Sequence, residues 1–369
     1  MTEAREWQSF VARETFYWAI STELAESFEK EADAVEQSES PSYIRVASLL
    51  EKAIQVHREI PRRYRSQRFD TSMRELRQRH VSASARGMEE FSPYESEPID
   101  LADMAISAEA HVRGKTTVEA LFALITLFPI PGSQSFSRAA PERGEGSVVD
   151  ILGTTVMTAE GLTVARIPSA LSGTDGELAR ARAIQDYVMS IELLVKGRIV
   201  PALEVFSREH HVQARELAHL VRESPAVPPG HEVFWLKGLA AGFNWDFLTS
   251  AHILVPQIEA FLRYLLKERG IDTTTRDADG IQSEAALGTL LAMDETADIL
   301  GHNLQFTLDA VLLDRLGPNF RNHQAHGLLV EGSAAGYVAA YVWWLCLYLV
   351  VLPFWAAGRT QQPGDQESA

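Results

Sequence analysis

The stretch YVAAYVWWLCLYLVVLPFWAA, Tyr337–Ala357, is apolar along its whole length and contains no charged residue. A run of this length can cross a lipid bilayer, but a helix buried on every side has the same composition. Gly332 and Gly336 precede the run, Pro353 interrupts it, and no cluster of basic residues flanks it. These features favour a buried helix over a membrane span. The stretch therefore predicts the last, buried helix of a helical domain.

The composition of the chain limits the classes of protein that it can belong to. The 369 residues carry a net charge of −16, and 46% of them are hydrophobic. This charge argues against binding nucleic acid through the overall field, although a local basic groove remains compatible with it. The single cysteine, Cys346, excludes an intrachain disulfide and a cysteine-based zinc site. We therefore expect a reducing compartment, the cytoplasm, and the N-terminal MTEAREWQSF lacks the pattern of a signal peptide.

The region before the apolar stretch predicts a mainly α fold with one small β-hairpin. Apolar residues recur at helical spacing within residues 10–35, 40–60, 116–128, 176–206 and 209–223. The residues Thr154–Met157 and Leu162–Ile167 are rich in β-branched side chains and flank the turn dipeptide Glu160-Gly161, so they predict a hairpin. We assign residues 1–223 to an N-terminal helical domain that includes this hairpin.

The segment Ser224–Gly230 contains three prolines and is the predicted domain boundary. Residues 231–357 then contain four or more helical segments with short connections, which indicates an antiparallel bundle. The Pro-, Gly- and Ser-rich segment 129–147 is expected to form a flexible loop. The polar residues 358–369 are expected to be a disordered tail.

Two familiar motifs are incomplete in this chain. RGKTTVEAL begins at Arg113, but a phosphate-binding loop needs a glycine where Glu109 stands. Glu216 and His219 form half of a di-iron helix motif, and the sequence lacks the second pair. We expect neither a metal ion nor a cofactor.

An arginine-rich segment, residues 58–79, stands out in the acidic chain. It holds eight arginines against three acidic residues, with Tyr64 and Phe69 among the arginines. This mixture is typical of a surface that follows phosphates and stacks bases, whereas a run of charge alone is more often a solvated helix face. The candidate RNA-binding residues in this segment are Arg62, Arg63, Arg65 and Arg68.

The hexapeptide RNHQAH, Arg321–His326, follows the helix breaker Gly317-Pro318, so a new helix is expected to begin near Asn319. Asn322 and His326 are four residues apart and would share a face of that helix. The arginine can hold a phosphate with two hydrogen bonds, and the histidine can transfer a proton near neutral pH. The alternative is a capping cluster at a helix terminus.

The same residues, read as RNHQAHG, resemble the RNxxxHG signature of a domain family within the HEPN superfamily, whose eukaryotic relative is an endoplasmic-reticulum membrane-associated RNA degradation protein. The segments 228–271 and 312–329 are similar to that family as well, so the resemblance covers roughly the last 130 residues. It implies a helical bundle that forms a homodimer with a composite active site. The activity that it implies is metal-independent endoribonuclease cleavage through attack by the RNA 2′-OH.

The resemblance assigns catalytic roles to Arg321, Asn322 and His326, and supporting roles to Glu259 and Arg263 on the neighbouring helix. Glu259 and Arg263 can equally be a salt pair on a helix surface. RNA is the implied substrate, and an antitoxin or another defence-system protein is a candidate partner for a toxin or antiphage effector. The alternative is a non-catalytic module that binds a nucleotide or a protein. Residues 231–369 hold eight basic and sixteen acidic residues, a balance that RNA binding alone does not explain.

Overall fold

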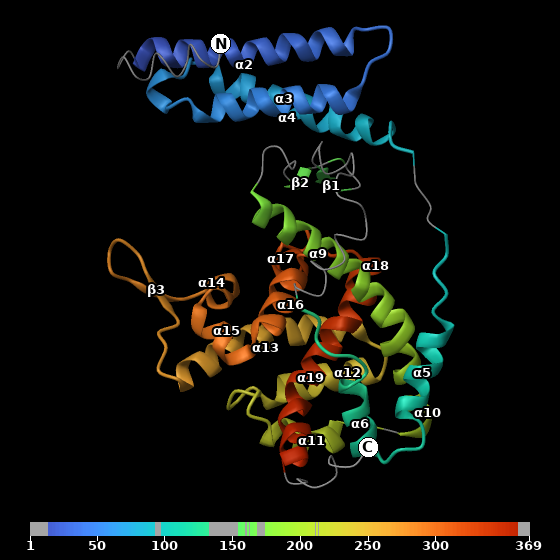
Figure 1. Ribbon diagram of the computed structural model, residues 1–369. Helices are drawn as coiled ribbons and strands as arrows, with labels where there is room; N and C mark the ends of the chain where they lie inside the picture. The colour runs from blue at the N-terminus through green and yellow to red at the C-terminus, as the bar shows by residue number, and fades with distance from the viewer. Residues whose placement is uncertain are drawn as a thin grey trace. The chain divides into compact units, whose positions relative to one another are not determined.

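The computed structural model confirms a mainly helical chain (Figure 1). The structure describes residues 14–92, 97–132, 154–158, 161, 163–167, 174–210, 212 and 214–360. The chain divides into two compact units. The first unit contains Met1–Glu97 and Thr154–Ile167, and the second contains Pro98–Gly153 and Pro168–Ala369.

The first unit is built on three helices that pack in chain order. Helices α2, α3 and α4 span Glu14–Glu36, Tyr43–Glu59 and Phe69–Met88, and a short turn of helix, η1, spans Arg62–Tyr64. The Ser42 hydroxyl caps α3 by accepting a hydrogen bond from the Arg45 N–H at 3.4 Å. The helices bury one small core. Its fully or nearly buried members are Ala32, Val46, Ala47, Leu49, Leu50, Ala53, Met73, Leu76 and Ala83.

The predicted β-hairpin is confirmed and belongs to this first unit. Strands β1, Thr154–Met157, and β2, Thr163–Ile167, pair in antiparallel fashion. Arg166 on β2 forms an ion pair with Glu51 on α3. This pair attaches the hairpin to helices that precede it by about a hundred residues in the sequence.

The second unit contains the remaining helices around one large core. Its first elements are α5 Ala102–Val112, α6 Thr117–Ile125, α9 Asp175–Leu194, the π-helical turn η3 Val195–Ile199, α10 Val200–Glu209 and α11 Ala214–Glu223. They are followed by α12 Glu232–Phe243, α13 Phe247–Glu268, strands β3 Thr274–Arg276 and β4 Gln282–Glu284, and α14 Leu287–Leu291. The last helices are α15 Asp294–Leu300, α16 His302–Leu312, α17 Phe320–Ala325, α18 Glu331–Ala334 and α19 Tyr337–Thr360.

Helix α19, which contains the apolar stretch, is the central element of this core. Trp343, Trp344 and Cys346 are fully buried, and the helix packs against α13, α6 and α12. The indole N–H of Trp344 donates to the Leu124 carbonyl at 2.7 Å, and that of Trp343 donates to the Leu239 carbonyl at 3.1 Å. Each indole is therefore fixed in the core by a hydrogen bond as well as by packing.

The burial of α19 bears on whether its apolar stretch spans a membrane. Within the described residues, Tyr337–Gly358 is the one helix long and apolar enough for a span, and 72% of its most apolar 18-residue window is buried. A helix covered by its own chain matches the composition of a core helix. Pro353 lies inside α19, which continues through it to Thr360. The predicted tail therefore begins in helix, and residues 361–369 lie outside the described residues.

The domain boundary predicted at Ser224–Gly230 does not coincide with the division of the chain. Ser224, Ala226 and Val227 are buried, and the Ser224 hydroxyl donates to the Val350 carbonyl on α19 at 2.9 Å. The proline-rich segment is thus packed against the central helix rather than exposed as a linker. Helices on both sides of it share one core, which is why the predicted domains 1–223 and 231–357 were wrong as compact units. Most of the loop predicted at 129–147, from residue 133 on, lies outside the described residues.

Candidate functional site

The helix that carries RNHQAH begins where the sequence predicts. Helix α17 spans Phe320–Ala325, and Asn319 precedes it in the left-handed conformation, with φ of 48°. Gly317 lies directly against α16, because a Cβ at this position would be 1.9 Å from the Ala310 carbonyl oxygen. The Phe320 side chain is 2% exposed and anchors α17 in the core. The residues Gly317 and Phe320 therefore have structural roles that fix where α17 starts.

The end of α17 is set by Gly327. The N–H of Leu328 donates to the His323 carbonyl at 2.8 Å, and the N–H of Gly327 donates to the Gln324 carbonyl at 3.2 Å. Gly327 has a φ of 67°. This pair of bonds around a left-handed residue is a Schellman motif, which closes a helix and favours glycine. The glycine of RNxxxHG is thus explained by backbone conformation.

Arg321 is held in place by two side chains. One guanidinium nitrogen lies 3.2 Å from the Glu259 carboxylate on α13, and another donates to the Asn322 side-chain oxygen at 3.3 Å. The Asn322 amide nitrogen in turn donates to the Asn319 side-chain oxygen at 2.7 Å. Asn322 accepts from one neighbour and donates to the other, so it orients Arg321 relative to the start of the helix.

The carboxylate that holds Arg321 belongs to a chain of ion pairs. Glu259 also pairs with Arg263 at 2.9 Å, and Arg263 pairs with Glu284 on β4 at 3.0 Å. Glu284 then pairs with Lys267 at 2.6 Å. Glu259 and Arg263 therefore form the salt pair four residues apart, and Glu259 also contacts the motif arginine. Three cations face two carboxylates, which leaves one net positive charge in this otherwise acidic part of the chain.

The hairpin that supplies Glu284 was missed at the level of sequence. Strands β3 and β4 pair from Thr274 opposite Glu284 to Arg276 opposite Gln282. The turn is closed by the Asp277 carboxylate, which accepts from the N–H groups of Asp279 and Ile281. Asp-x-Asp-Gly between two polar segments is a turn signal, but three-residue strands with no apolar alternation give no strand signal.

His326 differs from its neighbours in the motif because it is exposed. Its backbone N–H donates to the Asn322 carbonyl at 3.0 Å, but within the described chain its ring forms no hydrogen bond or ion pair. His326 lies five positions after Arg321, just beyond the end of α17, and the repeat of an ideal helix places such positions about 140° apart around the axis. Within the described chain, hydrogen bonds and ion pairs connect Arg321 with Asn322 and Glu259, and Glu259 with Arg263, but none of them involves the His326 ring.

Two aliphatic side chains that follow His326 in the sequence are exposed. Leu328 is 63% exposed and Val330 is 70% exposed, immediately after the Schellman turn. His323, the other histidine of RNHQAH, is half-buried and outside the RNxxxHG pattern.

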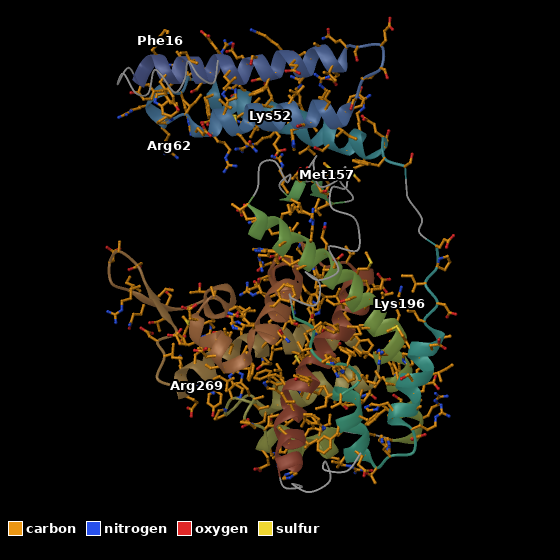
Figure 2. The ribbon with its side chains drawn as sticks, in the orientation of Figure 1. Phe16, Lys52, Arg62, Met157, Lys196 and Arg269 are labelled. Carbon is orange, nitrogen blue, oxygen red and sulfur yellow. The ribbon has the colours of Figure 1, made fainter. Side chains whose placement is uncertain are left out.

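The four candidate RNA-binding arginines lie in the first unit and fall into two kinds. Arg62, Arg63 and Arg68 are exposed, and Arg62 projects from the surface of the unit (Figure 2). The Arg65 guanidinium instead donates to the Ile60 carbonyl at 2.7 Å and stacks on the Phe69 ring, 4.5 Å from its centre. Arg65 therefore has a structural role, which a count of charges does not reveal.

A cavity of about 600 Å³ lies in the second unit, and the sequence does not predict it. Arg180 on α9 and Asp309 on α16 line it and form an ion pair at 2.6 Å. Phe306, in its wall, packs against Tyr187, whose hydroxyl is bonded to Thr307 at 3.0 Å and to Tyr341 at 2.8 Å. Burial raises the pKa of Tyr187 to about 12, so this network is neutral and structural. The cavity joins segments more than a hundred residues apart, and no local motif marks it.

The function of the chain is indicated neither by a metal-binding cluster nor by a known relative. Among the described residues no group of three His, Cys, Asp or Glu side chains is placed to hold a metal ion. Comparison with protein-family models, with curated proteins and with solved structures finds no match to this chain. The function must therefore be argued from the arrangement of the side chains.

Proposed function

We propose that this chain is a metal-independent endoribonuclease in which Arg321 holds the scissile phosphate, Asn322 orients Arg321 and His326 transfers a proton. The observation that supports the proposal most strongly is a contrast within RNHQAHG. Asn322 and Gly327 have local structural roles, whereas the exposed His326 ring has no partner within the described chain. An imidazole ring presented to solvent, in a motif that also holds an oriented guanidinium, is suited to general acid–base chemistry on a phosphodiester.

The proposed reaction needs only groups that RNA and the protein provide. The RNA 2′-oxygen attacks the adjacent phosphorus, a 2′-O–P bond forms, and the bond from phosphorus to the 5′-oxygen breaks. His326 accepts the proton of the 2′-OH and passes a proton to the leaving 5′-oxygen, and Arg321 stabilises the charge on the non-bridging oxygens. The products are a 2′,3′-cyclic phosphate and a 5′-OH end. DNA lacks the attacking hydroxyl and is not a substrate.

The arrangement supports a homodimer. Because the helical repeat separates positions 321 and 326 by about 140° around the axis, we infer that a second copy supplies one of the two groups that act on the phosphate. The exposed Leu328 beside His326 provides apolar area for such an interface. The toxin or antiphage role, an antitoxin or defence-system partner and the cytoplasmic location belong to the same proposal.

A second candidate function is favoured by the ion pair between Arg321 and Glu259. In this pair the carboxylate occupies the guanidinium that would hold a phosphate, so a ligand must compete with it. A non-catalytic module that binds a nucleotide or a protein through the exposed surface would leave the pair intact.

The decisive experiment compares RNA cleavage by the full chain, with and without EDTA, in wild type and two histidine variants. We expect His326→Ala to lower the cleavage rate by about 100-fold or more, the usual contribution of a general acid–base group. His323→Ala is the matched control, because it removes a histidine from the same helix outside the motif, and we expect it to cleave as wild type does. EDTA should leave the rate unchanged, and mass spectrometry should detect the cyclic phosphate.

The outcomes separate the two candidate functions. Cleavage by His326→Ala at the wild-type rate contradicts the catalytic assignment. Saturable binding of RNA, a nucleotide or a protein by a wild-type chain that never cleaves RNA supports the binding module instead.

A further inference from the structure

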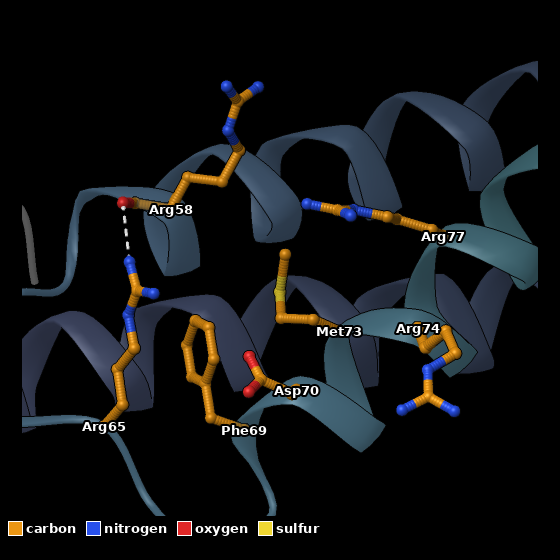
Figure 3. A pocket seen from close by; sticks show the side chains of 7 residues that line it. All are labelled: Arg58, Arg65, Phe69, Asp70, Met73, Arg74 and Arg77. Atoms are coloured by element: carbon orange, nitrogen blue, oxygen red, sulfur yellow. Dashed lines mark hydrogen bonds between the residues drawn. The ribbon is translucent and has the colours of Figure 1, made fainter. Parts of the chain in front are cut away.

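The first unit contains a cavity of about 400 Å³ between α3 and α4 (Figure 3). Cavities in the range of roughly 300–1,000 Å³ hold small organic ligands in proteins. The lining combines four guanidinium groups, one carboxylate and two apolar side chains. These residues are Arg58, Arg65, Phe69, Asp70, Met73, Arg74 and Arg77.

One arginine of the cavity is fixed and three are available. Arg65 is bonded to the Ile60 carbonyl and stacks on Phe69, so it forms a rigid wall. In the part of the chain that the structure describes, the guanidinium groups of Arg58, Arg74 and Arg77 form no hydrogen bond or ion pair. Figure 3 shows the Arg77 side chain reaching along the cavity toward Met73, while the guanidinium groups of Arg58 and Arg74 turn outward.

Another arginine on α4, Arg79, does have ion-pair partners. Arg79, two residues after Arg77, pairs with Asp33 at 2.5 Å and lies 3.5 Å from Glu36. These carboxylates on α2 neutralise Arg79, whereas the cavity holds only Asp70 against four arginines. Gathering like charges around one hollow costs free energy unless an anion occupies it. The lining residues carry four positive charges and one negative charge, so the cavity favours a ligand with about three negative charges, and the Arg58 and Arg74 side chains must turn inward to contact it.

We propose that this cavity binds a phosphorylated small molecule of nucleotide size, a nucleoside diphosphate being the best match in charge. Two phosphate groups carry roughly three negative charges at neutral pH, and guanidinium groups bind phosphate oxygens with paired hydrogen bonds. The floor is apolar, because Met73 is 5% exposed and Phe69 is half-buried, and a planar base can lie on it. This site is separate from Arg321–His326 and stands whether or not the chain cleaves RNA.

The test is calorimetric titration of the full chain with ADP, with inorganic pyrophosphate and with a short single-stranded RNA. The double variant Arg58→Gln/Arg77→Gln removes two cavity arginines whose side chains form no hydrogen bond or ion pair within the described structure, so it should fold. We expect it to weaken ADP binding at least tenfold. The matched control is Arg45→Gln/Arg86→Gln, which removes the same charge from exposed arginines outside the cavity lining and should bind ADP as wild type does.

Each remaining outcome decides against part or all of the proposal. If both double variants weakened ADP binding equally, the attraction would come from diffuse charge and the cavity would not be the site. Binding of the RNA but not of ADP would also overturn the proposal. Pyrophosphate binding as tight as ADP binding would overturn the role of the apolar floor. Failure of ADP to bind wild type overturns the proposal. Circular dichroism of both variants checks that weaker ADP binding is not caused by unfolding.

Discussion

The two units of this protein use their side chains in opposite ways. The second unit places Trp343, Trp344 and other large side chains at zero exposure in one core and pairs its motif arginine with a carboxylate. The first unit has a small core made largely of alanine and leucine, and among the described residues the Arg58, Arg74 and Arg77 side chains, which line a cavity, have no ion-pair partner. A unit with few buried large side chains has little stability of its own to lose. A bound anion would therefore change the stability of the first unit by a larger fraction than that of the second.

The largest expected effect tests whether the stability of the second unit depends on its tryptophan-rich core. Trp344→Ala removes a fully buried ring that stacks on Phe128 with centres 4.4 Å apart. We expect the free energy of unfolding to fall by about 3–5 kcal/mol, the usual cost of such a cavity. Urea denaturation monitored by circular dichroism measures it. Met189→Ala, which truncates a side chain that is 58% exposed, should change it by less than about 0.5 kcal/mol, and similar losses in both variants would contradict the comparison.

An intermediate effect tests the packing of the candidate site on that core. A Cβ at Gly317 would lie 1.9 Å from the Ala310 carbonyl oxygen, so Gly317→Ala must push α17 away from α16. The expected destabilisation is about 1–3 kcal/mol, as for other overpacked positions. Gly288→Ala on α14 is the control, because its nearest neighbour is 3.6 Å away and alanine should stabilise a helix by roughly 0.5–1 kcal/mol. Thermal unfolding of the two variants should shift in opposite directions, and a shift in the same direction would refute the packing argument.

The smallest expected effect is a pH dependence of stability that comes from a helix cap in the second unit. Backbone and side-chain hydrogen bonds from Thr116 lower the pKa of Glu119, which closes a capping box at the start of α6. A lowered carboxyl pKa stabilises the fold above the unfolded value of about 4.3, and this contribution disappears as the pH falls through the folded pKa. Glu119→Gln should therefore be slightly less stable than wild type at pH 7 and equal to it near pH 3. Urea titrations at both pH values test this, and a difference that persists at pH 3 would contradict the cause.

The sequence predicted the helices and the first hairpin because their signals are local. Apolar periodicity gave α2, α3 and α13, and the β-branched runs around Glu160-Gly161 gave β1 and β2. The boundary at Ser224–Gly230 was wrong because prolines mark a break in secondary structure, whereas a domain boundary depends on what packs on the segment. The contact of Ser224 with Val350 on α19 joins residues 126 positions apart, and no local pattern encodes it.

In the candidate site, too, the local features could be predicted from the sequence and the contacts between distant segments could not. The start of α17 near Asn319 could be predicted from Gly317-Pro318. Glu259, which the resemblance places on the neighbouring helix, contacts Arg321, but the ion pairs that continue to Glu284 join distant segments and could not be predicted. The arginines of residues 58–79 were counted in the sequence, but the cavity that four of them line requires α3 and α4 side by side.

The burial of Cys346 makes this thiol a natural probe of how often the core of the second unit opens. The thiol is fully buried among the aromatic side chains of α19, and burial raises its pKa. A thiol reagent in solution must therefore wait until the core around α19 opens. Because Cys346 is the only cysteine in the chain, the rate at which the native protein gains a single label reports how often that core opens, with no engineered probe.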